Sequence, residues 1–390
     1  MRKVLKWLGR IALVLVLAAI AVGLWKREEI TRLMAVNSLF SEEKIVTNFS
    51  NMNAAFLSTP VPRGDGPVSA LPQGRQIDLP VQVGPWIDDH ALTALVVLHQ
   101  GGIVHESYHQ GTAEDDRRIS WSVAKSFLSA LIGILLDEGV IGSLDDQVTD
   151  YAPALKGGAY DGATIRNVLN MASGVVFDED YLDPKSDINR MGRVLALGGE
   201  MDDFAAALQQ TFAPAGAEWK YVSIDTHVLS MVVRGASGRP VAELLSDRVI
   251  PPMGLEAEPY YLTDGVGTAF VLGGLNMITR DYARFGQMYL QDGFWNGRQI
   301  VPADWVAVST VPSAPTAQGD MGYGLQWWMP ADAAEGEYLA RGVYGQYIYI
   351  DRQRDVVIAA NAAHRAFREE GANALNIEMF RSIARSVREE

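Results

Sequence analysis

The chain has 390 residues, of which 48% are hydrophobic and 21% charged, a composition typical of a globular enzyme. Its formal net charge is −14 and its body has no run of lysines or arginines, which argues against nucleic acid as a partner. The sequence contains no cysteine, so disulfides, thiolate catalysis and cysteine-ligated metals are excluded.

The N-terminus has the features of a membrane-spanning segment. Four positive residues between Arg2 and Arg10 precede an uncharged apolar run from Ile11 to Trp25. With Arg10 extending towards the interface, the run reaches back through Leu8 to the ~20 residues that a spanning helix needs. Because the positive excess precedes the run, residues 1–25 are predicted to be an anchor with a cytoplasmic N-terminus.

A cleaved signal peptide is the alternative interpretation of the same segment. Ala19-Ile20-Ala21 fits the small-x-small cleavage pattern. The apolar run continues past this point to Trp25, which favours the anchor. Both interpretations place the rest of the chain across the membrane.

The remaining chain divides into two predicted parts. Residues 26–76 are expected to be a juxtamembrane segment and linker, helical to about residue 57 and then rich in proline and glycine from Ser58 to Pro67. Residues 77–390 are expected to form the main domain.

The pattern of the main domain predicts an α+β fold. Leu92–His99 and Ile103–Tyr108 are strand-like segments on either side of a Gly-Gly turn, a pattern that predicts a β-hairpin. The sequence pattern is mainly helical from residue 122 to about residue 290, and strand patterns return between residues 338 and 361. A final amphipathic helix follows, with an apolar face predicted from Leu375, Met379, Phe380, Ile383 and Val387. This order predicts one antiparallel sheet built from both chain ends, with a helical region inserted between them.

The tetrapeptide Ser122-Val-Ala-Lys125 is the strongest candidate for chemistry. It opens a long apolar stretch, and residues three apart on a helix share one face. Burial there disfavours the charged amine, which can then accept a proton from the serine and make it a nucleophile. A second copy, Ser41-Glu-Glu-Lys44, is flanked by carboxylates and predicted to be solvated. Tyr221-Val-Ser223, the only Tyr-x-Ser or Tyr-x-Asn in the chain, supplies a possible partner for Ser122.

A second motif, His105-Glu-Ser-Tyr-His109, matches the His-Glu-x-x-His pattern of zinc proteases. That pattern chelates a metal only on a helix, where its histidines lie one turn apart. Here it continues a predicted strand, on which the two residues are ~13 Å apart. No metal is therefore expected.

At this point the sequence resembles the serine β-lactamase and penicillin-binding-protein-like hydrolases, in the branch of class C β-lactamases, esterases and 6-aminohexanoate-dimer hydrolase. Segment Phe177–Tyr181 is most similar to the aminohexanoate branch. The resemblance extends from about Leu92 to Ala360. It rests on blocks at Ser122–Phe127, Leu136–Asp145, Thr164–Gly174, Tyr221–Ser223, Gly273–Phe285 and Tyr323–Trp328.

The resemblance implies a β-lactamase-like fold and an exported serine hydrolase that cleaves a small amide or ester through an acyl-enzyme, without metal or cofactor. It implies Ser122 as nucleophile, Lys125 as its base, and Tyr221, acidified by the amine, as the proton relay. The oxyanion would lie between the backbone N–H groups of Ser122 and Val343. The other implied pocket residues are Ser223, Gln346 and Tyr181.

One departure from the family bears on the substrate. The family's Lys-Thr-Gly or His-x-Gly corresponds to Ala340-Arg341-Gly342 here, so no lysine or histidine precedes the glycine. Neighbouring strand residues face opposite sides, so Arg341 is not an obvious substitute. This disfavours the first alternative, a β-lactamase or D-Ala-D-Ala carboxypeptidase. The second alternative, a non-catalytic envelope protein that binds cell-wall peptides, is disfavoured by the intact Ser122, Lys125 and Tyr221. The predicted location is the inner membrane, with the domain in the periplasm.

Overall fold

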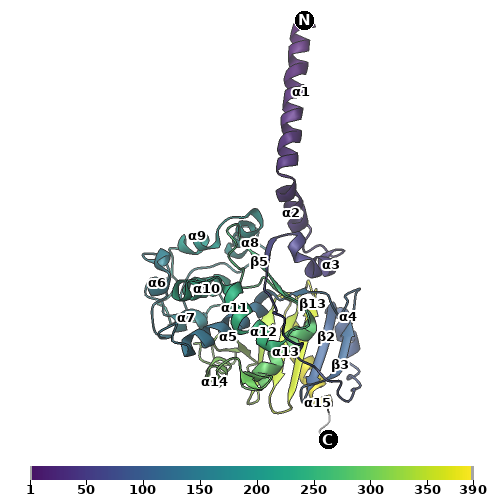
Figure 1. Cartoon of the computed structure of the whole chain (residues 1–390), viewed down its shortest axis with the longest axis vertical. Coiled ribbons are helices and arrows are strands. Elements are labelled where there is room, and N and C mark those ends of the chain that lie inside the picture. The colour runs from purple at the N-terminus through teal and green to yellow at the C-terminus, as the bar shows by residue number, and fades with distance from the viewer. Residues whose placement is uncertain (1, 388–390) are drawn as a thin grey trace.

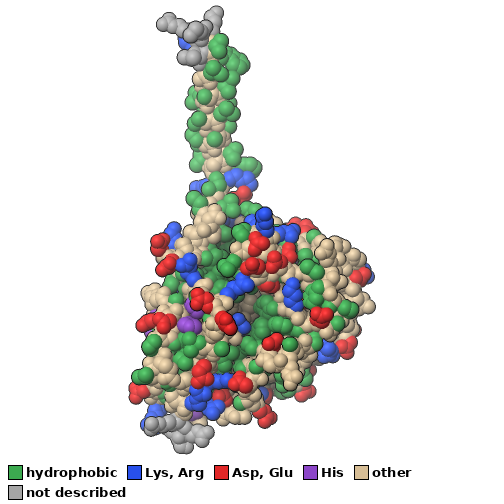
Figure 2. All heavy atoms as spheres, turned by 180° about the vertical axis from the view of Figure 1, so that it is seen from behind, with side chains coloured by type: hydrophobic (Ala, Val, Ile, Leu, Met, Phe, Trp, Pro, Cys, Tyr) green, Lys and Arg blue, Asp and Glu red, His purple; other side chains and the backbone are tan. Residues whose placement is uncertain are grey.

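The computed structural model describes residues 2–387, and Figure 1 shows a long helix projecting from a folded body. This helix, α1 (Arg2–Trp25), is followed by α2 (Arg27–Asn37). Within α1, the segment Lys6–Trp25 is long and apolar enough to cross a membrane, and none of it is buried against the body. In the space-filling view, hydrophobic side chains cover α1, whereas charged side chains are spread over the body (Figure 2).

The body is organised around a seven-stranded antiparallel sheet. Its order, β3-β2-β13-β12-β11-β10-β9, places strands from both ends of the domain side by side, as predicted. The predicted hairpin forms β2 and β3, and the returning strands form β11 to β13. The strands are β2 (Leu92–His99), β3 (Gly102–Tyr108), β9 (Gly322–Tyr323), β10 (Trp328–Met329), β11 (Glu337–Gly342), β12 (Gln346–Asp351) and β13 (Val356–Ala362).

Helices cover both faces of this sheet. One face packs against α13 (Thr279–Leu290), and the other against α4 (Val83–Asp89) and α15 (Ala372–Ser386). The terminal helix occupies its predicted position, but its buried face differs in part. Ile377 and Ala384 join Met379, Phe380 and Ile383 in the core, whereas Leu375 is 42% exposed.

The inserted region is helical and surrounds a central helix. The short turn η2 (Trp121–Val123) leads into α5 (Ala124–Asp137), which is buried over most of its length. The other helices of the region are α6 (Val148–Tyr151), η3 (Pro153–Leu155), α7 (Ile165–Leu169), α8 (Asp187–Leu197), α9 (Met201–Ala206), α10 (Ser223–Ser237), α11 (Val241–Arg248) and α12 (Ile250–Met253). Helix α14 (Ala303–Ser309) follows the region.

A second, four-stranded sheet incorporates part of the predicted linker. Its order is β1-β5-β6-β4, formed by β1 (Leu57–Pro60), β5 (Tyr260–Thr263), β6 (Leu275–Met277) and β4 (Arg118–Ile119). Just before β1 lie α3 (Ile45–Ser50) and η1 (Met52–Ala54). A separate hairpin joins β7 (Phe294–Trp295) and β8 (Arg298–Gln299).

Part of this segment packs into the core, so the folded body begins earlier in the chain than the predicted residue 77. Phe49, Met52 and Val61 are fully buried and belong to the main hydrophobic core. Residues from Leu39 onwards therefore pack with the domain, although the proline- and glycine-rich composition suggested a linker as far as residue 76. Apolar side chains spaced along a short helix and an edge strand account for this packing.

Candidate active site

Ser122 lies in η2, at the turn that opens α5. The preceding residue, Trp121, has a φ of 42°, in the left-handed region that non-glycine residues rarely adopt. The backbone N–H of Ser120 donates to the carbonyl of Leu275 at 2.8 Å, which ties the turn to the smaller sheet. Farther along, the Ser126 and Ser129 hydroxyls of α5 donate to carbonyls at positions 326 and 325. These contacts fix both ends of the turn Trp121–Val123, here called the nucleophile turn after the role predicted for Ser122.

Lys125 follows one turn later and is buried, with 2% of its surface exposed. Its Nζ lies 3.5 Å from the carbonyl oxygen of Ser223 and 5.5 Å from the centre of the Tyr221 ring. Desolvation lowers the pKa of Lys125 to about 7, although the carboxylates of Glu179 and Asp225 oppose this shift. A substantial fraction of the amine is therefore neutral near pH 7 and able to accept a proton.

Tyr221 comes just before α10 and is held in an aromatic stack. Its ring stacks on Trp328 with centroids 5.5 Å apart. Burial raises the pKa of Tyr221, although the Ser122 hydroxyl and the charge of Arg341 act to lower it. The expected acidification of the phenol is therefore not seen, because loss of solvent outweighs the favourable charges. A neutral phenol is a proton donor, which leaves Lys125 as the better base.

Glu179 is a site residue to which the sequence analysis gave no role. Its carboxylate accepts a hydrogen bond from the backbone N–H of Ser223, and its Oε2 is buried without a hydrogen-bond partner among the described residues. Burial raises the pKa of Glu179, and the nearby Lys125 opposes that shift. The only signal in the sequence was its place in Phe177–Tyr181, the segment that resembles the aminohexanoate branch.

Asp225 is a second carboxylate near Lys125. It is completely buried on α10, and the Tyr160 hydroxyl donates to its Oδ1 at 2.7 Å. Burial raises the pKa of Asp225 to about 7. Two carboxyl groups and one amine thus share a desolvated environment behind Ser122.

A cavity of about 580 Å³ opens in front of these groups. Four of the predicted site residues line it: Ser122, Tyr181, Tyr221 and Val343. The others are Glu179, Trp328, Arg341, Gly342, Phe367, Arg368, Glu369, Gly371, Asn373 and Ala374. Arg341 therefore reaches the cavity despite its place in the strand alternation, and its guanidinium lies 5.3 Å from the centre of the Trp328 ring.

The end of β11 approaches the nucleophile turn very closely. A Cβ atom added to Gly342 would lie 2.6 Å from the carbonyl oxygen of Ser120 and 3.0 Å from the backbone nitrogen of Ser122. Only glycine fits this approach without displacing backbone. Val343 follows directly and lines the same cavity, so the two backbone groups predicted to bind an oxyanion lie on adjoining walls.

Two predicted pocket residues do not line this cavity in the described chain. The Gln346 side chain donates to the carbonyl of Ala362 at 2.7 Å and accepts from the Asn361 amide at 3.0 Å, so it holds β12 to β13. Ser223 is buried behind Glu179 and Tyr221, where its backbone carbonyl faces Lys125. Gln346 through its side chain and Ser223 through its backbone therefore support the site from behind.

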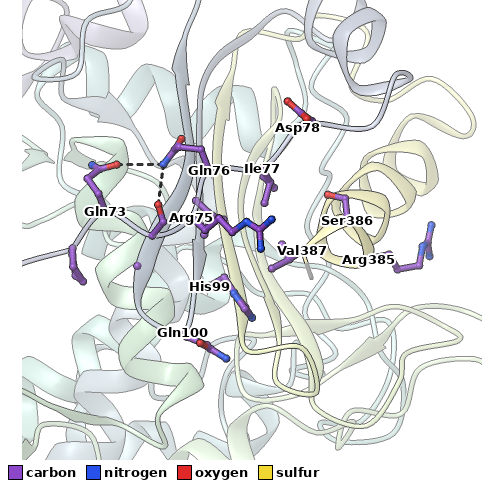
Figure 3. A pocket seen from close by; sticks show the side chains of 14 residues that line it. Gln73, Arg75, Gln76, Ile77, Asp78, His99, Gln100, Arg385, Ser386 and Val387 are labelled. Atoms are coloured by element: carbon purple, nitrogen blue, oxygen red, sulfur yellow. Dashed lines mark hydrogen bonds between the residues drawn. The ribbon is translucent and has the colours of Figure 1, made fainter. Parts of the chain in front are cut away.

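A second cavity, of about 720 Å³, lies elsewhere (Figure 3). It is formed where residues 72–78 run beside His99, Gln100 and the end of α15. None of the predicted site residues lines it. The cavity that contains Ser122 is therefore the candidate active site.

The His-Glu-x-x-His segment lies on a strand, as predicted. His105 is in β3 and His109 follows it, and the Nε2 atoms of both lie 3.0 Å from the Ser107 hydroxyl. Alternation along the strand puts all three side chains on one face, so the two imidazoles lie much closer together than the ~13 Å expected for the two residues. Between residues 2 and 387 no group of three or more histidine, aspartate or glutamate residues is arranged to hold a metal ion.

The fold and the cavity define a class of protein: serine hydrolases built on an antiparallel sheet with an inserted helical region. The beta-lactamase family model matches residues 90–378, and the chain belongs to this family. It is a serine hydrolase of the amidase or esterase type.

The chain is similar to specific members of this family. The 6-aminohexanoate-dimer hydrolase of Paenarthrobacter ureafaciens is 29% identical over 323 residues, covering 79% of this chain and 80% of that protein. The solved "Putative 6-aminohexanoate-dimer hydrolase from Bacillus anthracis" has a TM-score of 0.78 at 26% identity, covering 89% of this chain and 95% of that one. A penicillin-binding protein homologue from Pyrococcus abyssi has a TM-score of 0.55 at 16% identity, covering 76% of each chain, and shows the shared fold alone.

Proposed function

We propose that this protein cleaves an amide or ester bond of a small molecule through an acyl-enzyme formed on Ser122. The observation that carries the proposal is the burial of Lys125 against the ring of Tyr221, which lines one cavity together with Ser122. A lysine whose pKa is lowered to about 7 can accept the serine proton at neutral pH. No metal or cofactor enters the scheme.

The first half of the reaction moves one proton around the site. Ser122 Oγ gives its proton to Lys125 Nζ and bonds to the substrate carbonyl carbon, whose oxygen becomes negative between the N–H groups of Ser122 and Val343. Breakage of the C–N or C–O bond then releases the leaving group, which takes a proton from the Tyr221 phenol. Tyr221 recovers a proton from the Lys125 ammonium.

The second half hydrolyses the acyl-enzyme. Water attacks the ester carbon and gives its proton to the Lys125 and Tyr221 pair, and the bond to Ser122 Oγ breaks. Ser122 then recovers its proton, so the site returns to its starting state. Because the raised pKa of Tyr221 keeps its phenol neutral, the phenol carries a proton in each direction.

The substrate is proposed to resemble the linear amides and esters of related hydrolases. Similarity to 6-aminohexanoate-dimer hydrolase supports this choice, as does the absence of a lysine or histidine before Gly342. Arg341 gives the cavity a positive charge, which favours substrates that carry a carboxylate. β-Lactams carry one as well, so they remain the second candidate substrate.

We further propose that α1 tethers the hydrolase to the inner membrane with its domain in the periplasm. The exposed apolar surface of Lys6–Trp25 and the positive residues before it support this orientation. Protease added to spheroplasts should degrade the domain and spare an N-terminal tag. A domain protected until lysis would contradict the orientation, and a mature chain beginning at Val22 would favour a cleaved signal.

Covalent labelling tests the nucleophile. A fluorophosphonate should label the full chain and Ser41→Ala, but not Ser122→Ala, with all three equally folded by circular dichroism. Labelling of Ser122→Ala would contradict the assignment, and failure of the full chain to react would favour the non-catalytic binding protein. A panel of p-nitrophenyl esters, aminohexanoate oligomers and nitrocefin then ranks the substrate classes.

A further inference from the structure

Four aromatic side chains join the segment after α2 to both walls of the active site. They are Phe40, Phe49, Trp121 and Tyr344, here called the aromatic clamp. Phe40 stacks on Tyr344 with ring centroids 5.0 Å apart and planes 11° apart, and it lies 6.0 Å from Trp121. Phe49 meets the same two rings edge-on, at 5.6 Å from Trp121 and 5.4 Å from Tyr344. The two N-terminal rings therefore each contact both rings of the catalytic domain.

The two domain rings flank the proposed oxyanion site. Trp121 immediately precedes Ser122, and Tyr344 immediately follows Val343. Both have positive φ angles, 42° for Trp121 and 59° for Tyr344. Non-glycine residues keep such backbone conformations only where surrounding contacts enforce them, and such residues often occur at active sites. The clamp supplies such contacts to both residues, and Tyr344 also packs on Phe367, which lines the cavity.

The segment that carries Phe40 and Phe49 is itself anchored near the nucleophile. The buried guanidinium of Arg118 donates to the carbonyl of Val46 at 2.7 Å and to the Ser50 hydroxyl at 2.6 Å. Arg118 belongs to β4, three residues before Trp121. The position of Phe49 is therefore fixed relative to the nucleophile turn by polar as well as aromatic contacts.

Phe40 is the most informative member of the clamp, because 40% of its surface is exposed. Burial alone gives little reason for a phenylalanine at this position, whereas nearly parallel stacking on Tyr344 requires a flat ring. Both Phe40 and Phe49 lie outside residues 90–378, the part of the chain that the family model matches.

We propose that Phe40 and Phe49 are positioning residues, which hold Trp121 and Tyr344 so that the N–H groups of Ser122 and Val343 stay at the separation that an oxyanion requires. The proposal rests on the function proposed above. It makes the segment leading from the membrane helix a working part of the active site.

The test compares Phe40→Ala, Phe40→Tyr and Phe294→Ala in the detergent-solubilised full chain. Phe294 is 47% exposed in the β7–β8 hairpin and serves as a matched control. With a p-nitrophenyl ester, Phe40→Ala should lower kcat at least tenfold and leave KM within about twofold, because oxyanion contacts act in the transition state. Phe40→Tyr should restore kcat, and Phe294→Ala should match the parent chain.

A thionoester supplies a readout that a merely structural role would not change. Sulfur is larger than oxygen and a weaker acceptor, so a well-formed oxyanion site favours the oxoester. The ratio of kcat for the oxoester to kcat for the thionoester should fall in Phe40→Ala. Phe49→Leu, which keeps an apolar side chain in the buried position, should lower the same ratio.

The outcomes separate the two proposals. Unchanged kcat and an unchanged oxoester preference in Phe40→Ala and Phe49→Leu would overturn the positioning role, as would an equal loss in Phe294→Ala. If Ser122→Ala still hydrolyses the ester, the proposed function itself fails. If Ser122 is required and the phenylalanine variants behave like the parent chain, only the clamp fails.

Discussion

The chain contains the same tetrapeptide pattern, Ser-x-x-Lys, in two very different environments. In the copy at Ser41, the hydroxyl donates to the carbonyl of Ser38 at 3.0 Å, and Lys44 is exposed at the start of α3. In the copy at Ser122, Lys125 is buried within α5. The comparison shows that the pattern places a serine near an amine, but desolvation decides whether the amine can act as a base.

The two copies are also neighbours in space. Phe40, which precedes Ser41, packs against Trp121, which precedes Ser122. One copy therefore lies in the segment proposed to support the other. The same substitution made in both copies tests the effect of the surroundings, because the residue type is the same and only its environment differs.

The largest difference between the copies is expected for their lysines. Lys125→Met keeps the length of the side chain and removes the base, so kcat/KM should fall by about 10²–10⁴. Lys44→Met should leave kcat/KM unchanged, because Lys44 is solvated. Steady-state kinetics on one activated ester measures both variants. Equal effects at the two positions would contradict the role of burial.

Tyr221→Phe sharpens the same comparison. It should lower kcat/KM by a similar factor, because the relay loses its proton. The double variant with Lys125→Met should be little worse than either single variant, since groups that act as one unit give non-additive losses. A double loss equal to the product of the two single losses would indicate independent roles.

The next largest effect is expected where the strand meets the nucleophile turn. In Gly342→Ala, the new methyl group meets the Ser120 carbonyl at 2.6 Å and must push β11 away from Ser122. We expect kcat to fall by about 10²-fold, comparable to loss of one oxyanion donor. Gly84→Ala, at a glycine of α4 with no atom within 4 Å of the added Cβ, is the control. Equal kcat in both variants would place the oxyanion site elsewhere.

A smaller effect follows from pH. Because burial lowers the pKa of Lys125 to about 7, the neutral base is present above that pH and is lost as the pH falls. Asp225, whose pKa burial raises to about 7, and Glu179 lie near the same amine, so their titration also affects how kcat/KM falls at low pH. A pH profile of kcat/KM should fall about tenfold per unit below the midpoint of this limb. A flat profile down to pH 5 would contradict a lysine base.

The smallest expected effect concerns substrate choice. Arg341→Ala should raise KM by about tenfold for an ester that carries a distal carboxylate and hardly change KM for its neutral analogue, because the guanidinium supplies an ion pair. Arg352→Ala provides the control, since Arg352 pairs with Asp292 and does not line the cavity. Equal changes for the charged and neutral esters would show that Arg341 acts through packing on Trp328.

Much of the architecture could be predicted from local pattern. Strand-like segments on either side of Gly101-Gly102 predicted the β2–β3 hairpin, and apolar strand patterns predicted β12 and β13. The apolar stretch after Ser122 specified α5, and an uncharged run specified α1. These features depend on residues close together in the sequence, so local apolar runs and turn residues are enough to predict them.

Other features depend on segments that are distant in sequence, and only the tertiary structure decided them. The burial of Glu179 and Asp225 around Lys125, and the raised pKa of Tyr221, arise because other segments exclude water from charged or polar groups. Neighbours far along the chain likewise decide that Arg341 lines the cavity, that Leu375 is exposed and that Phe49 packs into the core. The candidate reacting groups could thus be predicted from the sequence, whereas folding determined their protonation and the contacts that hold them, because desolvation and packing are properties of the assembled core.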